Sequence, residues 1–444
     1  MKKLDEAVLV DPIRSVNFFN GRLLTAEDLR EEREAARAHR RALGRGVGAG
    51  VVEGLWVTSV SGGSGPAVRV EAGRAIDGDG TDLTLPQPVT LSLTEREKQL
   101  VAIAPDFDVC LPPQGALLEG VGVYLLVMSP QATLSVDRAP KSGLGTDGRA
   151  FGCEARWVLE TVVFRMEYVQ LDAALFPELT GALATELAAL DAANDEASRS
   201  LRRNYIAHLF FGTLARRRAG IDPFATGSAG SAYAAYGPVD ALRGSGVLRP
   251  CDVPLALISW RGATLDFVDV WPVRRRPIPP ARSATLPALG DDRARREGEA
   301  VHLQFFEQMQ QVLTTASQPS MVRATDYFRF LPPCGLLRVQ QPGRRGVAVD
   351  VFFQGFPRRE PPMVDAALLD QLVARSFRYE PIDVREQELV WLYRPWQNVW
   401  ERDHGASIQD VVVFTSPHVP EQGLARFDVA RWDYSNFASG RGCE

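Results

Sequence analysis

Histidine and cysteine are scarce in this chain, which holds five of each among 444 residues. The histidines form no HExxH pattern, and none has a second histidine or a cysteine at metal-binding spacing. The cysteines show no CxxC spacing, which favours a reducing compartment and argues against a disulfide scaffold or a cysteine-ligated zinc site. They are Cys110, Cys153, Cys251, Cys334 and Cys443. The sequence therefore predicts no metal site and no cofactor.

Long apolar runs are also missing. No stretch of about 18 apolar residues occurs, so no membrane-spanning helix is expected. The opening residues, MKKLDEAVLV, lack an apolar centre and are not expected to act as a signal peptide. The net charge of −5 gives no general attraction to nucleic acid or anionic membrane. We expect a cytoplasmic protein that binds no nucleic acid.

Motifs of known catalytic chemistry are absent as well. No serine lies in a GxSxG pattern, and we nominate no catalytic residue. A pair of facing carboxylates stays open as an enzymatic alternative, because such pairs meet in space rather than in sequence. The first acids to test for that alternative are Glu380, Asp383 and Glu386.

Two glycine-containing segments invite ligand-binding interpretations that their context opposes. The glycines of 44–50 follow a helical pattern and precede a strand, the reverse of the order in a phosphate-binding loop. The segment 77–80, DGDG, is typical of a hairpin turn. It is not a calcium loop, because Asp82 and Pro88 replace the glycine and glutamate that an EF-hand requires.

The chain length predicts about three domains. Residues 1–168 should form a β-rich shell, a sandwich or jelly roll, preceded by one helix. Its strands are expected, from β-branched content and turn signals, at 51–60, 68–74, 83–85, 89–93, 99–104, 121–128 and 157–168. The polar segment 129–152 is expected to be a surface loop.

Residues 169–318 should form a helical neck. Helices are expected at 179–190, 194–218 and 291–316, with a hairpin at 253–270, a loop at 219–247 and a basic, proline-rich linker at 271–283. The last helix has an apolar face that includes Phe305, Phe306 and Met309, opposite the glutamines Gln304, Gln308 and Gln311. Because long helices depend on packing for stability, we expect partners from other subunits to complete this bundle.

Residues 319–444 should form a smaller mixed α/β head. Strands are expected at 336–339, 347–353, 389–393 and 411–414, and a helix at 362–378. The tail is rich in aromatic side chains, which often anchor cores and interfaces. The fold class predicted for the whole chain is α+β, with shell, neck and head in this order.

One stretch, 17–57, stands out. An apolar turn leads into a helix at 25–43, which begins with the capping pair Thr25 and Asp28. The front of this helix is acidic and its rear is basic, in accord with the helix dipole. Its narrow stripe of Leu29, Ala36 and Leu43 offers an edge for docking.

The order of features in 16–93 resembles the TssK family, the baseplate subunit of type VI secretion systems. The matching pieces are the turn 18–24, the helix 25–43, the glycine-containing turn before 51–52, the segment 73–76 and the hairpin 77–85. The tryptophan that usually precedes the turn in that family is missing here. The chain also resembles proteins found with extracellular or thylakoid-type contractile injection systems, through NFFNGRLLTAEDL, CDVPLALISW, YFRFLPPCGLL and HVPEQGLARFDVARWDYSNF.

The resemblance implies a non-enzymatic baseplate or adaptor subunit and a homotrimer. Its partners would be other baseplate proteins and a membrane anchor or fibre. Alternatives are a receptor- or glycan-binding fibre module and an acid-pair hydrolase. The residues expected to contact partners are Phe18, Phe19, Leu23, Leu24, Leu29, Phe305, Met309, Trp396, Trp400 and Trp432.

Overall fold

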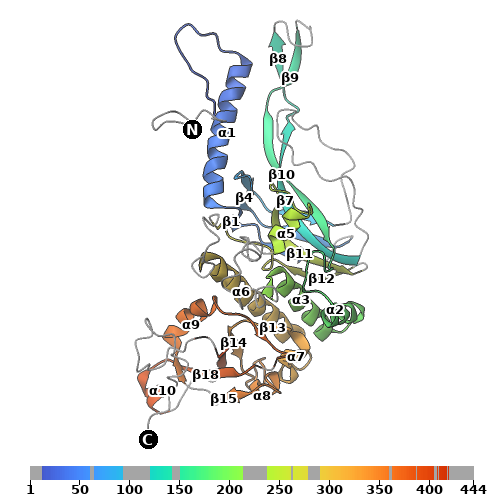
Figure 1. Ribbon diagram of the computed structural model, residues 1–444, viewed down its shortest axis with the longest axis vertical. Coiled ribbons are helices and arrows are strands. Elements are labelled where there is room, and N and C mark those ends of the chain that lie inside the picture. The colour runs from blue at the N-terminus through green and yellow to red at the C-terminus, as the bar shows by residue number, and fades with distance from the viewer. Residues whose placement is uncertain are drawn as a thin grey trace, which may run out of the picture.

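A computed structural model describes residues 13–60, 65–93, 121–142, 151–213, 238–261, 264–278, 291–359, 363–386, 388–404, 408, 410–417 and 419. The molecule is elongated (Figure 1). A long helix and a β-ribbon project from one end of a central body of sheets, helices lie beneath this body, and the C-terminal part lies at the opposite end. The coarse α+β prediction is confirmed by this mixture of helices and small, mostly antiparallel sheets. A sandwich or jelly-roll arrangement of the shell stays a prediction.

The projecting helix α1 spans Ala26–Val47. It begins with the predicted capping box, in which Thr25 accepts a hydrogen bond from the Asp28 backbone and Asp28 accepts one from the Thr25 backbone. It ends at Gly48, whose φ of 97° lies in the region that glycine tolerates. The helix therefore runs past the predicted end at 43, and the first glycines of 44–50 belong to its last turn.

Two small antiparallel sheets follow in the body. The first contains β1 (Gly50–Gly54), β4 (Gly73–Ile76) and β5 (Asp82–Leu85), and the second contains β2 (Val57–Val60), β3 (Ala67–Val70) and β6 (Val89–Ser92). The predicted strands 51–60 and 68–74 are thus each divided between two sheets. The first division falls at Leu55, a non-glycine residue at φ 55° whose side chain is buried in the core. The segment 99–104 lies outside the described residues.

A third sheet crosses the centre of the molecule in the order β10-β7-β11-β12. Its strands are β7 (Val121–Leu134), β10 (Val158–Val169), β11 (Val253–Arg261) and β12 (Thr264–Asp269). The hairpin predicted at 253–270 is confirmed, but β11 pairs with β7 from Val121 to Met128. It therefore belongs to a sheet and not, as expected, to a helical bundle.

The same β7 and β10 continue beyond the body. Past Met128, β7 pairs with β10 as far as Leu134 opposite Val158, and the ribbon continues into β8 (Arg138–Ser142) and β9 (Phe151–Ala155). We call residues 130–142 and 151–162 the β-arm. The prediction of a surface loop at 129–152 is wrong for 129–142 and 151–152. The side chains at this position are polar because a two-stranded ribbon is solvated on both faces.

Beneath the sheet lie α2 (Ala182–Ala192), α3 (Glu196–Phe210), α5 (Pro238–Gly244) and α6 (Asp291–Thr315). From Arg202 to Phe210 every residue of α3 is buried. On α6 the predicted apolar face holds for Phe305 and Met309, whereas Phe306 is 49% exposed. Gln304 and Gln308, expected on a polar outer side, are buried. The helices of the predicted neck thus find packing partners inside the chain, which corrects the argument that they need other subunits.

The C-terminal part holds α7 (Ala324–Tyr327), the strand pair β13 (Phe330–Leu331) and β17 (Ile382–Asp383), and a sheet ordered β14-β19-β18-β15. The strands of this sheet are β14 (Cys334–Arg338), β19 (Val411–Thr415), β18 (Val390–Trp396) and β15 (Arg358–Arg359), with β16 (Met363–Asp365) paired to β18. The predicted strand at 347–353 is wrong, because α8 (Val349–Phe352) forms there and buries Phe352 and Phe353. The helix predicted at 362–378 forms only in part: the segment begins with β16 and a 3₁₀ turn (Ala366–Leu368) and continues as α9 (Leu369–Ser376). A short helix, α10 (Val399–Asp403), follows β18.

The cysteine spacing argued against disulfide bonds, and the structure corrects this expectation at one cysteine. Cys251 is disulfide-bonded, whereas Cys153 and Cys334 are free thiols. Burial raises the pKa of the Cys334 thiol to about 12, so this cysteine is a core residue without thiolate reactivity.

Candidate interaction surfaces

The residues that precede α1 present apolar side chains to solvent. We call 13–24 the N-terminal turn. It is held by polar contacts: Arg22 donates to the Asn17 carbonyl over 2.8 Å and pairs with Asp28, and the Val16 N–H donates to Glu32 over 3.0 Å. The large apolar side chains take no part in these contacts. Their exposed fractions are Ile13 46%, Phe18 53%, Phe19 62%, Leu23 86% and Leu24 51%.

Helix α1 buries little of its own surface. Ala35 is its one buried residue, while Leu29 and Leu43 of the predicted stripe are 57% and 73% exposed. The helix contacts the body at its C-terminal end, where Gly44 lies so close to Gly80 that a Cβ at Gly44 would stand 2.1 Å from the Gly80 carbonyl oxygen. Glycine at both positions is what allows this approach of two backbones.

A second connection joins α1 to the β-arm. The Arg37 guanidinium forms an ion pair of 2.7 Å with Glu160 on β10. The β-arm itself exposes Val136 (95%), Trp157 (53%) and Leu159 (50%). Because a two-stranded ribbon alone is marginally stable in water, these exposed apolar side chains indicate a second surface available to partners.

Other predicted contact residues differ in their placement. Phe305 and Met309 are 2% and 4% exposed in the core between α6 and the C-terminal sheet, so we leave them out of any docking surface. Trp396 is half-buried. Trp400 is 64% exposed and stacks on His404, with ring centroids 4.4 Å apart. Trp432 lies outside the described residues.

Between the body and the C-terminal part lies a buried polar network that the sequence did not predict. Arg203 on α3 donates to Asp269 on β12 and to Glu307 and Gln311 on α6, each over 2.8 Å. Gln304 donates to Asp269 over 3.2 Å. These contacts join residues up to 108 positions apart, which is why a pattern search within each helix could not find them.

Asn204, the next residue of α3, contacts the C-terminal part. Asn204 accepts hydrogen bonds from the backbone N–H groups of Arg329 and Phe330 and donates to the Phe330 carbonyl. His208, one turn further along α3, lies against the Phe330 ring at a centroid distance of 4.7 Å. Arg329 in turn forms a buried ion pair of 2.7 Å with Asp383.

This pairing bears on the enzymatic alternative. The Asp383 carboxylate accepts hydrogen bonds from Arg329 and from the Arg385 backbone, so it has a structural role. Glu380 and Glu386 are exposed. In the described part of the chain, no group of three or more acidic, histidine or cysteine residues is placed to hold a metal ion.

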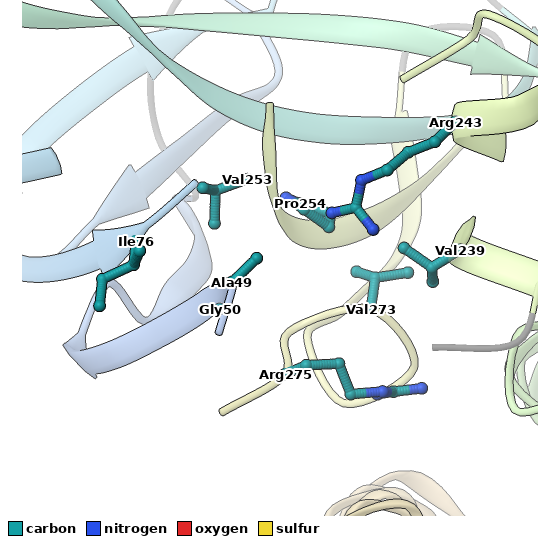
Figure 2. Close-up of a pocket in the computed structure, with 9 residues that line it drawn as sticks. All are labelled: Ala49, Gly50, Ile76, Val239, Arg243, Val253, Pro254, Val273 and Arg275. Atoms are coloured by element: carbon teal, nitrogen blue, oxygen red, sulfur yellow. The ribbon is translucent and has the colours of Figure 1, made fainter. Parts of the chain in front are cut away.

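A small cavity lies between the end of α1, the central sheet and α5 (Figure 2). The volume within it that water can reach is ≈10 Å³, room for about one water molecule. Figure 2 shows Arg243 reaching toward Pro254, with Arg275 at the opposite side. The lining residues are Ala49, Gly50, Ile76, Val239, Arg243, Val253, Pro254, Val273 and Arg275. No candidate acid lines this cavity, and its size suits no organic substrate.

The turn at 77–80 connects β4 and β5, as predicted. The Asp77 side chain is 1% exposed, and one of its oxygens accepts a hydrogen bond of 2.7 Å from the Thr81 backbone. The other oxygen has no hydrogen-bond partner. Burial raises the pKa of this carboxyl to about 6. The turn thus buries a carboxyl group that is destabilised in its ionised form.

No protein family matches the sequence, and no curated protein matches it. A solved structure titled "Crystal structure of TssK" aligns over 91% of this chain and 96% of that one, at 11% identity and a TM-score of 0.22. A TM-score this low does not define a common fold, although the alignment covers most of both chains. In the described segments, no helix combines the length and apolarity needed to cross a bilayer.

Proposed function

We propose that the protein is a docking subunit of a multi-protein assembly, and specifically a baseplate or adaptor component of a phage-tail-like contractile injection system. The observation that carries the proposal is the N-terminal turn, whose Phe18, Phe19, Leu23 and Leu24 are all more than half exposed on a projecting element. The choice of assembly rests on the sequence resemblance of 16–93 and of the longer motifs.

The energetics of α1 support the docking role. A helix of 22 residues is about 33 Å long. Most helices gain their stability by burying an apolar face, yet α1 buries one alanine within the chain. A partner that covers the N-terminal turn and the stripe of Leu29, Ala36 and Leu43 would supply the missing burial. Each Å² of apolar surface removed from water would contribute about 25 cal/mol.

The remaining assignments belong to the same proposal. The shell, 1–168, binds other baseplate proteins, and the head, 319–444, contacts a membrane anchor or a fibre. The chain acts as a homotrimer in a cytoplasmic particle. Since α3 and α6 are packed inside one chain, contacts between copies would use the β-arm rather than an intertwined neck.

The experiment that tests the proposal combines two measurements. Light scattering coupled to size exclusion gives the mass of the full chain, for which we expect three copies. Co-expression with the other baseplate proteins encoded in the same genome should then give a complex that Leu23→Ser/Leu24→Ser dissociates. Met321→Ser, which removes one exposed apolar side chain outside the N-terminal turn and the β-arm, is the control. Failure of the unaltered chain to bind any baseplate protein would contradict the proposal.

A second candidate function rests on Trp400. An exposed indole that is held flat against His404 offers a stacking surface of the kind that binds sugar rings. Asn398 and Glu401 lie beside it in the chain, and their polar groups are typical of sugar-binding sites. Binding of the full chain to cell-surface polysaccharide that is lost in Trp400→Ala, with subunit assembly unchanged, would favour the fibre-module alternative.

A further inference from the structure

Arg274 occupies an unusual environment at the surface of the body. Its guanidinium carbon lies 3.9 Å from the centroid of the Trp56 ring, a cation–π contact. One terminal nitrogen donates to the Gly54 carbonyl over 2.7 Å. The Nε atom is buried and has no hydrogen-bond partner. The side chain is half-buried, so a large part of its hydration is lost.

No carboxylate of the described residues forms an ion pair with Arg274. Burial, and to a smaller extent the like charge of Arg276, lowers the pKa of Arg274 to about 10. Two buried arginines of this chain have counter-charges: Arg203 pairs with Asp269 and Glu307, and Arg329 pairs with Asp383. Because removing a charge from water without a counter-charge is unfavourable, an anion bound at Arg274 would supply what these carboxylates supply to Arg203 and Arg329.

The ring that Arg274 covers is partly exposed. Trp56 retains 40% of its surface in solvent. The strands that flank it in sequence expose Val52 (50%) on β1 and Val60 (36%) on β2. Trp271 packs edge-on against Trp56, with centroids 5.3 Å apart, and its indole N–H donates to Glu307 over 2.8 Å. The hydrogen bond to Glu307 therefore holds Trp271, and through it Trp56, in position, while part of the Trp56 ring stays exposed to solvent.

We propose that Arg274 and Trp56 form a docking site for an acidic segment of a protein partner. A carboxylate of that segment binds the Arg274 guanidinium, and a neighbouring apolar side chain packs on the exposed part of the Trp56 indole. The charge of the site selects an anion, because a guanidinium N–H forms a charge-assisted hydrogen bond with a carboxylate. The exposed part of the Trp56 indole favours a peptide over a small inorganic anion, because a peptide can also place an apolar side chain on that ring.

The proposal deepens the proposed function, on which it rests, by naming the chemistry of one partner. The site is distinct from the N-terminal turn and lies next to the polar network of Arg203, because Trp271 and Arg203 both bind Glu307. A partner at Trp56 therefore contacts the body close to where the body joins the C-terminal part.

The test uses the full chain and a blocked peptide in which glutamate alternates with leucine, with the glutamine version as the neutral probe. Binding is measured by titration calorimetry and by tryptophan fluorescence. We expect the glutamate peptide to bind and the glutamine peptide not to bind. Arg274→Gln should weaken binding about tenfold or more, as expected for loss of a charge-assisted hydrogen bond.

The controls separate a binding role from a structural one. Arg274→Lys keeps the charge and should retain part of the affinity, which a variant that merely misfolds would not. Arg344→Gln removes an exposed arginine that pairs with Asp410 in the C-terminal part, away from Trp56, and should leave binding unchanged. Equal binding of the two peptides, unchanged binding in Arg274→Gln, or equally tight binding of inorganic phosphate would each overturn the proposal. These outcomes leave the test of the N-terminal turn untouched, so the two failures are distinguishable.

Discussion

The side-chain amide of Asn204 pairs with the backbone of Phe330 in the manner of a neighbouring β-strand. Its Oδ1 accepts from the Phe330 N–H at 2.8 Å, and its Nδ2 donates to the Phe330 carbonyl at 3.1 Å. Both residues are buried, and 126 positions separate them in the sequence. One asparagine on α3 thus supplies the hydrogen bonds that the start of β13 requires at the body end of the C-terminal part.

Replacing Asn204 with alanine should lower the free energy of unfolding by about 2–4 kcal/mol, because two backbone N–H groups and one carbonyl would be left buried without partners. Chemical denaturation of the full chain measures this change. Asn398→Ala is the matched control, because Asn398 caps the exposed helix α10 by accepting from the Glu401 N–H. Its loss should lower the free energy by about 1 kcal/mol. Equal effects would mean that Asn204 is not a special contact.

Asp77 should make the protein less stable as the pH rises. Burial raises the pKa of its carboxyl from 3.8 to about 6 in the folded state, so ionisation is easier in the unfolded chain. Stability from this group is present below pH 3.8, decreases as the pH rises through about 6, and is constant above. Asp77→Asn keeps an acceptor for Thr81 and should raise the free energy of unfolding at neutral pH by about 1–2 kcal/mol.

The comparison for Asp77 is Asp82→Asn on the adjoining strand. Asp82 is exposed and pairs with Arg74 at 2.9 Å, so its replacement should change stability little. Denaturation curves recorded from pH 4 to pH 8 check both variants. A pH profile that Asp77→Asn leaves unaltered would show that another group causes the dependence.

The contact between α1 and the body predicts opposite effects for two glycines in one helix turn. A Cβ at Gly44 would stand 2.1 Å from the Gly80 carbonyl, whereas a Cβ at Gly46 would meet nothing within 4 Å. Gly44→Ala should therefore displace α1 and destabilise the protein by about 1–3 kcal/mol. Gly46→Ala should stabilise the helix by about 0.5–1 kcal/mol. Proteolysis rates within α1 and thermal unfolding would reveal the difference, and the same sign for both variants would argue against this contact.

Neighbouring phenylalanines on α6 test which face of that helix is buried. Phe305→Ala should lower the free energy of unfolding by about 3–5 kcal/mol, because Phe305 is 2% exposed and packs against Phe328 and Phe414. Phe306→Ala should change it by less than about 1 kcal/mol, because Phe306 is 49% exposed. Urea denaturation of both variants decides the matter, and a large loss in Phe306→Ala would indicate that this side chain is covered by another copy.

Local signals in the sequence were sufficient for elements that depend on local physics. Thr25 and Asp28 are three positions apart, and their capping box forms as the spacing predicts. The apolar period of α6 places Phe305 and Met309 in the core. The candidate surface at Phe18–Leu24 could be selected because several large apolar residues precede a charged helix. That selection still depended on a resemblance, since composition alone does not distinguish an exposed turn from a buried one.

The failures have a common physical cause in contacts between distant residues. The helical period placed Gln304 and Gln308 on a polar, solvent-facing side of α6. Both are buried, and they donate hydrogen bonds to Asp269 and Ser200, respectively. The run that ends at Phe353 has strand-like composition, yet it forms a helix because Phe352 and Phe353 fill the core there. Trp56 and Arg274 lie 218 positions apart, so neither could be predicted as half of a site.

The β-arm and the body share the strand β7, and this continuity has a mechanical consequence. A pull on the arm along its length is transmitted by β7 into its ladder with β11, where Val121 to Met128 lie beside Val253 to Arg261. Antiparallel hydrogen bonds run perpendicular to the strands, so such a pull loads all of them together in shear instead of opening them one by one. The arm is therefore an element through which tension could pass into the molecule without unzipping it.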